Sequence, residues 1–402
     1  LAAMSASLTV AARVEGAHVM LIRPHAKTMT ETYQGLWTPS IMCLSNRKVF
    51  GNAFKQLKMD GGRFMTEAGY RNAQSGKWIA RPSQCMPSPV HVSSLDPRQP
   101  ALFFVRESKL IDILQDQIEK SDNVEVVNDS YVVSFEEEEK YIKSVITQNE
   151  ERYSCDHLIV ADGKFSPCRA LLNAHSPLHY RGYRVTRGLT SRNVTGNTSF
   201  QSWGKGTRFA TVPVGRDSNI WFYTNSEEEC PESLDPSTDH IYGENALRSI
   251  KDATFHDPIG EIIADTVTST VHAQSALESF GSIYDSKKSN VYFVGDAART
   301  LDPILAVGAG LAIEDGFDVA NTISSSSGQR NKASMDRESR IRRLRRLSNL
   351  SQFSGQMNSS LLISIRDMLC TANTNLTSKM FDSFMSSSVR LTSDEVTLFR
   401  RG

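Results

Sequence analysis

The feature that most constrains the fold of this chain is the segment VYFVGDAARTLDPILAVGAGLAIEDG, residues 291–316. It predicts a buried strand that ends at Gly295 and Asp296, followed by a turn and by a helix that starts with glycines. At the carboxyl end of a strand, the Asp296 carboxylate can accept hydrogen bonds from sugar-like hydroxyls. Gly308 and Gly310 let backbone N–H groups approach a ligand closely, and the positive end of the helix favours negative charge.

Two further residues belong to this segment: Pro303 fixes the direction of the loop, and Ala309 lies between the two glycines. A second candidate segment is LIVADGKFSPCR, residues 158–169, in which a buried strand leads into a turn at Asp162 and Gly163. For both segments, the alternative to ligand binding is an ordinary exit from a strand.

The order of predicted elements places a β-rich middle between two α/β parts. Residues 4–14 are typical of a helix and residues 17–22 of a buried strand, which is half of a βαβ unit without its first strand. Residues 25–95 have weak periodicity and are expected to be irregular. Further helices are predicted at 107–120, 245–266, 305–322 and 334–365, and strands at 124–135, 140–148, 157–161, 291–295 and within 180–225.

Length and composition limit the classes of function. A chain of 402 residues is long enough for two or three domains. Lys+Arg and Asp+Glu both number 45, and this neutral balance argues against a general nucleic-acid binder. The sequence has no apolar run of the length that a transmembrane span needs, about 18 residues. The six cysteines form no CxxC pair and are expected to be reduced thiols.

Titratable clusters outside these segments are expected to be structural. His175 and His179 are four residues apart, but Pro177 lies between them, so no metal site is predicted. The acidic run from Glu136 to Glu139 is expected at a solvated hairpin tip. The basic run RIRRLRR, 340–346, is expected on a solvated helix face, with a membrane-surface or partner patch as the alternative.

The segment at 291–316 resembles the Gly-Asp motif of the flavin-dependent aromatic hydroxylases. These group A, single-component FAD monooxygenases include zeaxanthin epoxidases and ubiquinone-pathway hydroxylases. Their pattern is Gly-Asp-Ala-Ala-His, then Pro, then Gly-Gln-Gly. The segment at 158–169 resembles the Asp-Gly motif of the family, and residues 203–223 resemble strands of its substrate domain, including Trp203, Arg208, Pro213 and Trp221.

The resemblance implies an α/β fold like that of p-hydroxybenzoate hydroxylase, in which a β-sheet substrate domain interrupts a Rossmann-like FAD-binding domain. Residues 1–175 and 286–330 are expected to form the FAD-binding domain, with an irregular insertion at about 25–95. Residues 176–285 are expected to form the substrate domain, and residues 331–402 a helical C-terminal segment.

The resemblance also implies which residues contact the cofactor. Ala3 matches the third glycine position of the dinucleotide fingerprint, whose first strand and first two glycines would lie before Leu1. Arg106 matches a helix-start arginine that lies near FAD. The other implied cofactor-binding residues are Asp162, Gly163, Gly295, Asp296, Pro303, Gly308, Ala309 and Gly310.

The chemistry implied by the resemblance is carried by the flavin. NAD(P)H reduces FAD, and the reduced flavin forms with O₂ a C4a-hydroperoxide that transfers one oxygen atom to a phenol or an alkene. FAD is therefore expected as cofactor, NAD(P)H as transient reductant, and a small aromatic or isoprenoid molecule as substrate. No side-chain nucleophile is required, so no catalytic residue is assigned.

Three residues depart from the family pattern. Arg23 stands where an acidic residue usually holds a ribose, Arg299 replaces the usual His, and Ala306 replaces a Gly. Two alternatives therefore stay open: a non-catalytic structural or regulatory subunit of a larger assembly, and a relative that keeps FAD as a scaffold for a non-redox step. An intracellular site is expected, in an organelle such as a plastid or mitochondrion, with the protein either dissolved or peripherally bound to a membrane.

Overall fold

The computed structural model describes residues 1–25, 31–81, 96–97, 100–174, 176–227, 241–251, 255–285, 287–325 and 331–400. His175 of the predicted histidine pair lies outside these residues, as do 82–95 of the segment expected to be irregular and 252–254 of the predicted helix at 245–266.

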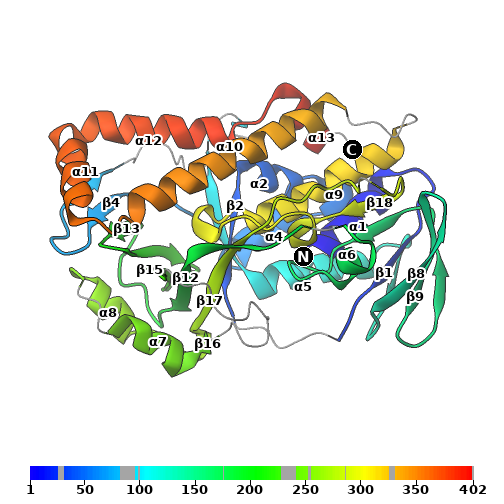
Figure 1. Ribbon diagram of the computed structural model, residues 1–402, viewed down its shortest axis with the longest axis horizontal. Helices are drawn as coiled ribbons and strands as arrows, with labels where there is room; N and C mark the ends of the chain where they lie inside the picture. The colour runs from blue at the N-terminus through cyan, green and yellow to red at the C-terminus, as the bar shows by residue number, and fades with distance from the viewer. Residues whose placement is uncertain are drawn as a thin grey trace.

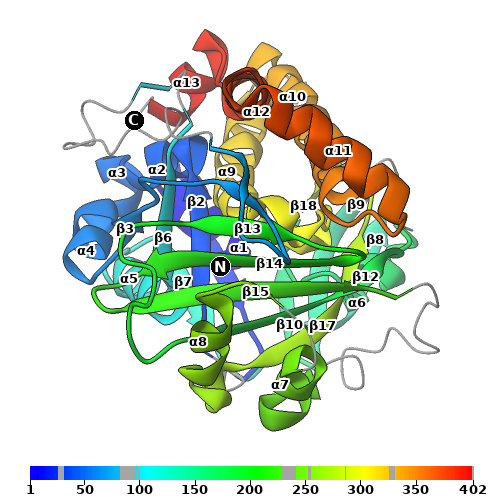
Figure 2. The same cartoon turned by 90° about the vertical axis from the view of Figure 1, so that its left-hand side faces the viewer.

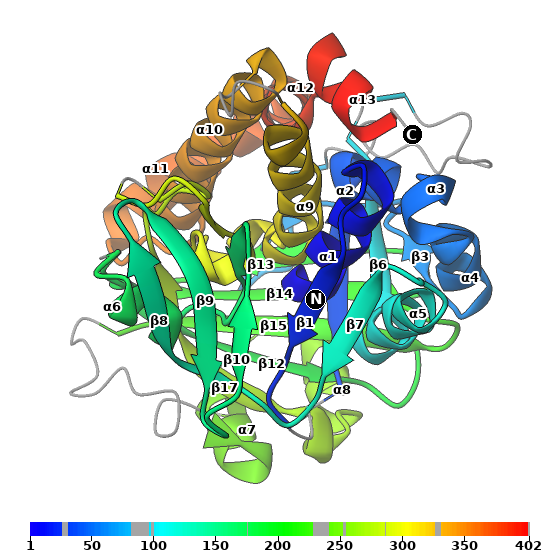
Figure 3. The same ribbon diagram turned by 90° about the vertical axis from the view of Figure 1, so that its right-hand side faces the viewer.

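Two pairs of parallel strands form the α/β part of the fold, which the sequence predicts at 1–175 and 286–330. β1 (Val19–Ile22) pairs with β7 (Val124–Val127), and β11 (Leu158–Val160) pairs with β18 (Val291–Phe293). In the described chain the two pairs are separate sheets, and α1 (Ala2–Arg13) contacts strands of both. α1 also packs along α9 (Gly308–Ser324), as Figure 3 shows. The predicted helix, strand and strand–turn–helix segments at the two ends of the chain are therefore confirmed.

A large sheet crosses the molecule beside these strands (Figure 2). Its order is β16 (Ile241–Tyr242), β17 (His272–Glu278), β12 (His179–Leu189), β15 (Ser218–Ser226), β14 (Thr207–Val214), β13 (Phe200–Trp203), β4 (Tyr70–Asn72) and β5 (Trp78–Ala80). Because side chains alternate along a strand, β14 serves both faces. Phe209 joins a core with α7 (Gly243–Lys251) and α8 (Ile259–Ala264), whereas Val212 packs toward α9 and α10 (Lys332–Gly355).

The expectation that residues 25–95 are irregular is wrong for most of the segment. It contains β2 (Tyr33–Trp37), α2 (Thr38–Leu44), α3 (Arg47–Phe50), α4 (Ala53–Met59) and β3 (Arg63–Phe64), besides β4 and β5. β2 and β3 pair with β6 (Leu102–Arg106), which leads into α5 (Glu107–Glu119). Each element is so short that its buried side chains, such as Leu36, Ile41 and Phe50, set up no readable period.

The predicted strand at 124–135 is two strands, β7 and β8 (Val132–Glu138), because the chain turns at Asp129, which has φ +55°. β8 pairs with β9 (Tyr141–Thr147), and β9 pairs with β10 (Arg152–Ser154). The acidic run is therefore mostly strand, and the hairpin turns at Glu139, which has φ +52°.

Two predicted long helices are interrupted. The helix expected at 245–266 is α7 and α8; Pro258 precedes α8 and cannot donate a helical hydrogen bond. The helix expected at 334–365 is α10 and α11 (Ser360–Ala372), and the hydroxyl of Ser359 caps α11 by accepting from the Leu362 N–H. α12 (Thr374–Val389) then runs back beside α10, and α13 (Ser393–Arg400) completes the C-terminal part (Figure 1). No described helix has the length and apolarity that crossing a bilayer needs.

The expectation that the basic run at 340–346 is a solvated face is wrong for its first residue. Arg340 is buried, and its guanidinium pairs with Glu314 of α9 and, at 2.8 Å, with Glu395 of α13. Arg342 and Arg346 do lie on the exposed face of α10. Arg340 therefore joins three helices that are distant in sequence.

Replacing Arg340 with Ala is expected to lower the free energy of unfolding by about 3–5 kcal/mol, because the buried Glu395 carboxylate loses its arginine and the Glu314 carboxylate keeps only Arg337. The measurement is chemical denaturation followed by circular dichroism. Arg342→Ala, on the exposed face of the same helix, is the matched control and should change the value by less than about 0.5 kcal/mol. Equal effects of the two substitutions would contradict a structural role for the Arg340 ion pairs.

Candidate functional site

The two sequence segments singled out for ligand binding leave the same edge of the parallel sheet. β11 and β18 are neighbours, with Val160 opposite Phe293. Asp162 and Asp296 therefore both follow the carboxyl ends of adjacent parallel strands, which is where ligands bind in open α/β sheets.

Gly295 is held tightly between these strands and α1. Its φ is +60°, and a Cβ at this position would lie 2.7 Å from the Cβ of Ala2. A side chain here would therefore push the start of α1 away from the turn. Ala3, the next residue of α1, is half-buried and packs against the hydrophobic core, so the predicted fingerprint position adjoins the residue that contacts the turn.

Asp296 occupies a recessed but open position. Its residue surface is exposed, yet enough protein atoms surround the carboxylate that desolvation raises its pKa. Lys164 lowers the pKa, and Asp315 raises it again. Its carboxylate oxygens can accept hydrogen bonds from ligand hydroxyls.

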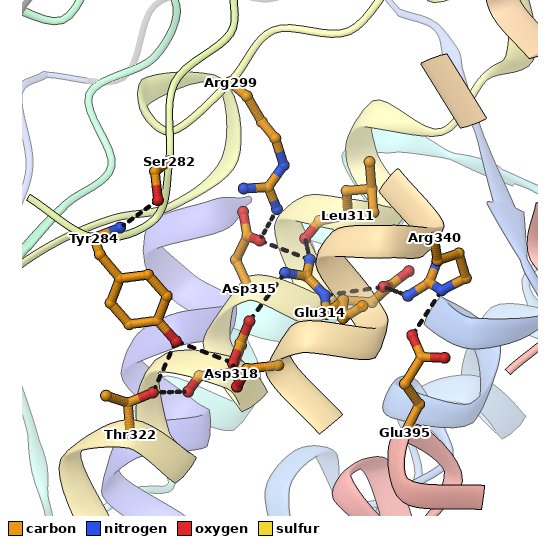
Figure 4. Close-up of polar contacts among 12 residues, drawn as sticks. Ser282, Tyr284, Arg299, Leu311, Glu314, Asp315, Asp318, Thr322, Arg340 and Glu395 are labelled. Atoms are coloured by element: carbon orange, nitrogen blue, oxygen red, sulfur yellow. Dashed lines mark hydrogen bonds and ion pairs between the residues drawn. The ribbon is translucent and has the colours of Figure 1, made fainter. Parts of the chain in front are cut away.

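Asp315 of α9 fixes the turn after β18, and Figure 4 shows its contact with Arg299 at the end of that turn. One carboxylate oxygen of Asp315 accepts the Gly295 N–H at 2.7 Å. The other accepts from Arg299 at 2.5 Å and from Arg337 at 2.6 Å. Arg337 also pairs with Glu314 and Asp318, so the turn, α9 and α10 share one buried ionic cluster.

Arg299 is therefore part of the interior at this turn. Its Nη2 pairs with Asp315, whereas Nε and Nη1 are buried and have no hydrogen-bond partner among the described residues. The residue that replaces the usual His of the resembled motif thus has a structural partner on α9.

The loop between β18 and α9 makes a close approach to β2. Pro303 begins a short 3₁₀ turn, Pro303–Leu305. The Ile304 N–H in this turn donates to the Asp302 carboxylate. Ala306 has φ +51°, which is left-handed. A Cβ on Gly35 would lie 2.9 Å from the Ala306 Cβ, so a glycine at position 35 makes room for Ala306.

The start of α9 is open at one glycine and packed at the other. No side chain caps this helix, and a Cβ on Gly308 would meet no atom within 4 Å. A Cβ on Gly310 would lie 2.8 Å from the Ser40 hydroxyl, so packing against α2 explains that glycine. Ala309 packs against the core, which leaves Gly308 as the position with space for a ligand.

Four other residues that the sequence singled out lie after β11, at the start of α5 and after β1. Asp162 accepts from the Cys168 N–H at 3.0 Å and so stabilises the turn into α6 (Pro167–Leu171), while Gly163 has φ +88° and open space beside it. Arg106, at the start of α5, approaches the Tyr33 hydroxyl at 3.5 Å. Arg23, at the end of β1, donates to Asn128 at 2.8 Å and to Gln115 at 2.6 Å.

A cavity of about 200 Å³ lies between the large sheet and the 303–306 loop. Side chains from the sheet, β2, β6, α10 and α12 form most of its wall, which is largely apolar and aromatic. Lining residues include Trp37, Phe104, Tyr183, Arg187, Trp203, Arg208, Phe222, Ile304, Leu305, Ala306, Leu347 and Met385. Trp203 and Arg208 were singled out in the sequence; Trp221 instead lies in the core, stacked on Phe209.

Arg208 is the unusual polar group of this cavity. The residue is only 4% exposed, and no hydrogen bond or ion pair reaches its guanidinium from the described residues. Desolvation lowers its pKa, opposed by the nearby Tyr183 and Asp302. Tyr183 itself donates to Asp302 at 2.5 Å.

No metal centre competes with this site in the described part of the chain, where no three His, Cys, Asp or Glu side chains gather closely enough to hold an ion.

Most of the site lies within a region that matches a protein family. The model of the FAD binding domain matches residues 62–353. The aurachin C monooxygenase/isomerase of Stigmatella aurantiaca is 30% identical over 42% of this chain and 43% of its own length. The chloroplastic zeaxanthin epoxidase of Prunus armeniaca is 26% identical over 48% of this chain and 29% of its own length. The matches thus span less than half of these relatives.

Solved structures share the fold over nearly the whole chain. Klebsiella pneumoniae HpxO, complexed with FAD and uric acid, superposes with a TM-score of 0.73 at 18% identity and covers 96% of this chain and 95% of its own. Pseudomonas aeruginosa PqsL with 2-aminobenzoylacetate has a TM-score of 0.63 at 18% identity, covering 95% of both chains.

The environment of Cys168 beside the Asp162 turn yields a reactivity prediction. Burial and the Asp162 carboxylate raise the pKa of the Cys168 thiol to about 12. Alkylation by iodoacetamide, followed by mass spectrometry, should therefore be slow at about pH 8 and rise about tenfold per pH unit above it. The urea-unfolded chain, in which a thiol has an ordinary pKa of about 8.5, is the control. Rapid labelling of the folded chain at about pH 8 would contradict this environment.

Proposed function

Because this chain belongs to the FAD-binding monooxygenase family, we propose that it is an FAD- and NAD(P)H-dependent monooxygenase that places one oxygen atom of O₂ on a small aromatic or alkene-type molecule. The proposal rests on one observation: a single loop contributes both to the predicted cofactor site and to the wall of the cavity. The chain after β18 begins at the recessed Asp296 and continues into residues 303–306, which line the apolar cavity. A cofactor held at the first end would reach a substrate held at the second.

The residues at this loop fit a flavin dinucleotide. Asp296 offers a carboxylate to ribityl hydroxyls, and Gly308 leaves space at an uncapped helix start, where a positive dipole favours an anionic ring. Gly163 leaves similar space beside the neighbouring strand. FAD supplies the redox chemistry when bound, and the chain supplies position, exclusion of water and the local field.

The cavity favours a flat, apolar substrate with one oxygen that accepts hydrogen bonds. Its aromatic and aliphatic wall excludes water. A purely apolar molecule in the cavity would leave the Arg208 guanidinium without a hydrogen-bond partner. A phenolate, enolate or carboxylate oxygen would complete it, because charge-assisted hydrogen bonds are the strong ones in a dry site. Arg208 would then hold the substrate oxygen and favour its anionic form.

A second candidate is a relative without redox activity. Two observations favour it: Arg23 occupies the end of β1 with its own partners Asn128 and Gln115, and Ala306 adds a methyl group beside the site. FAD retained through gel filtration without NAD(P)H consumption would indicate a scaffold role. A colourless protein that takes up no FAD would favour the non-catalytic subunit and contradict the monooxygenase proposal.

Asp296→Ala is expected to weaken FAD binding about tenfold or more, because it removes a charge-assisted hydrogen bond of about 1.5–3 kcal/mol. The measurement is titration of flavin fluorescence with each variant. Asp112→Ala, which removes an exposed carboxylate on α5, is the control and should leave FAD affinity unchanged. Unchanged binding in the Asp296 variant would remove this residue from the cofactor site.

Arg208→Gln is expected to raise KM about tenfold or more for a substrate found by screening phenols, hydroxyquinolines and aromatic carboxylates for stimulated NAD(P)H oxidation. Arg208→Lys, which keeps the charge, should restore part of the loss. Arg192→Gln removes an exposed arginine near the same sheet and serves as control. Equal KM values for all variants would show that Arg208 does not contact the substrate.

A further inference from the structure

The helix α11 is oriented with its apolar stripe outward. Leu361, Leu362, Ile365, Met368 and Leu369 recur at the spacing of one helix face and are all exposed, Leu361 by 70% and Leu369 by 63%. In a helix that covers a soluble core, such a stripe faces inward.

The polar side of α11 faces the protein instead. Arg366 is only 7% exposed; it donates to the Ser354 carbonyl at 2.7 Å, and its guanidinium lies 5.2 Å from the ring centroid of Trp203. Asp367 accepts from Asn72 of β4 at 2.8 Å. These inward contacts fix the rotation of the helix, so the outward direction of its apolar stripe is not a matter of local fraying.

The exposed stripe continues onto the two neighbouring helices. Leu350 and Phe353 are exposed near the end of α10, and Leu376 and Met380 are exposed on α12. Figures 1 and 2 show α11 at one end of the molecule, joined to α10 and α12. We call the exposed apolar side chains of residues 350–380 the apolar end.

Charges around the apolar end have one sign on the outer surface. Arg346 precedes Leu350 on the same face of α10, and Lys379 is exposed on α12. Glu338, two turns before Arg346, pairs with Arg342; Asp367 pairs with Arg366, and Asp382 lines the cavity. Apolar side chains flanked by exposed basic groups are typical of helices that lie in a membrane interface.

We propose that the apolar end docks this protein onto the surface of a bilayer that contains anionic lipids, with α11 lying in the interface. A second copy of the chain fits less well, because a two-fold contact would bring Arg346 and Lys379 of the two copies together at the apolar end. Anionic headgroups supply the missing negative charge, and the acyl region accepts the leucines and methionines.

Docking at this place would bring a membrane close to the cavity. α10 contributes Leu347 to the cavity wall and Leu350 to the apolar end. Likewise, α12 contributes Met385 to the cavity wall and Met380 to the apolar end. The same two helices thus separate the cavity from the proposed lipid surface. This relation does not depend on the proposed oxygen transfer, since it concerns only where the surface lies.

The test is co-sedimentation of the full chain with vesicles of phosphatidylcholine containing phosphatidylglycerol, and with vesicles of phosphatidylcholine alone. Wild type should bind the anionic vesicles, and Leu361→Ser combined with Leu369→Ser should weaken binding about tenfold or more. Met59→Ser, which changes a residue 68% exposed on α4, is the matched control and should bind like wild type. Lys379→Gln combined with Arg346→Gln should weaken binding to the anionic vesicles, and added salt should do the same.

Three results would overturn the proposal. The first is a wild-type protein that sediments with neither vesicle. The second is a dimer in solution that the two serine substitutions dissociate while vesicle binding is absent. The third is a large fall in melting temperature on these substitutions, which would show that the stripe packs within the protein. FAD binding and NAD(P)H oxidation in the serine variants should stay unchanged, so a failure of docking is distinct from a failure of the proposed function.

Discussion

The site depends on the hydrogen bond and ion pairs that the Asp315 carboxylate makes. It accepts the Gly295 N–H and pairs with Arg299 and Arg337, so it joins the turn after β18 to α9 and α10. Three buried arginines, Arg299, Arg337 and Arg340, face the carboxylates of Glu314, Asp315, Asp318 and Glu395 in one cluster. Because breaking a buried pair leaves an uncompensated charge, this cluster holds the turn in one geometry.

The helix α10 carries this constraint to the rest of the molecule. Its inner face holds Arg337 and Arg340 against α9, and Leu347 of the same helix lines the cavity. Its outer face presents Arg346 and Leu350. A single helix therefore relates the turn, the cavity and the exposed apolar end, which are far apart in the sequence.

The sequence predicts the parts of the fold that local chemistry determines. Gly295 and Asp296 follow a strongly apolar strand, so their place at a sheet edge was predictable. Arg340 was not, because its partners Glu314 and Glu395 are distant in sequence and a basic run looks solvated. The short elements between 33 and 80 were missed because two to seven residues set up no period. The roles of the cofactor residues stay predictions, although the structure places the Gly295–Asp296 turn against the start of α1.

In the proposed function, the buried guanidinium of Arg208 would link ligand binding to folding. In the unfolded chain this group is hydrated, whereas in the folded cavity it lacks a protein partner among the described residues, so the folded state alone bears the desolvation. A ligand that accepts its hydrogen bonds binds only the folded state and stabilises it by about 2.7 kcal/mol at a hundred times Kd. The side chain that selects the ligand would therefore also make the occupied protein harder to unfold and to degrade than the empty one.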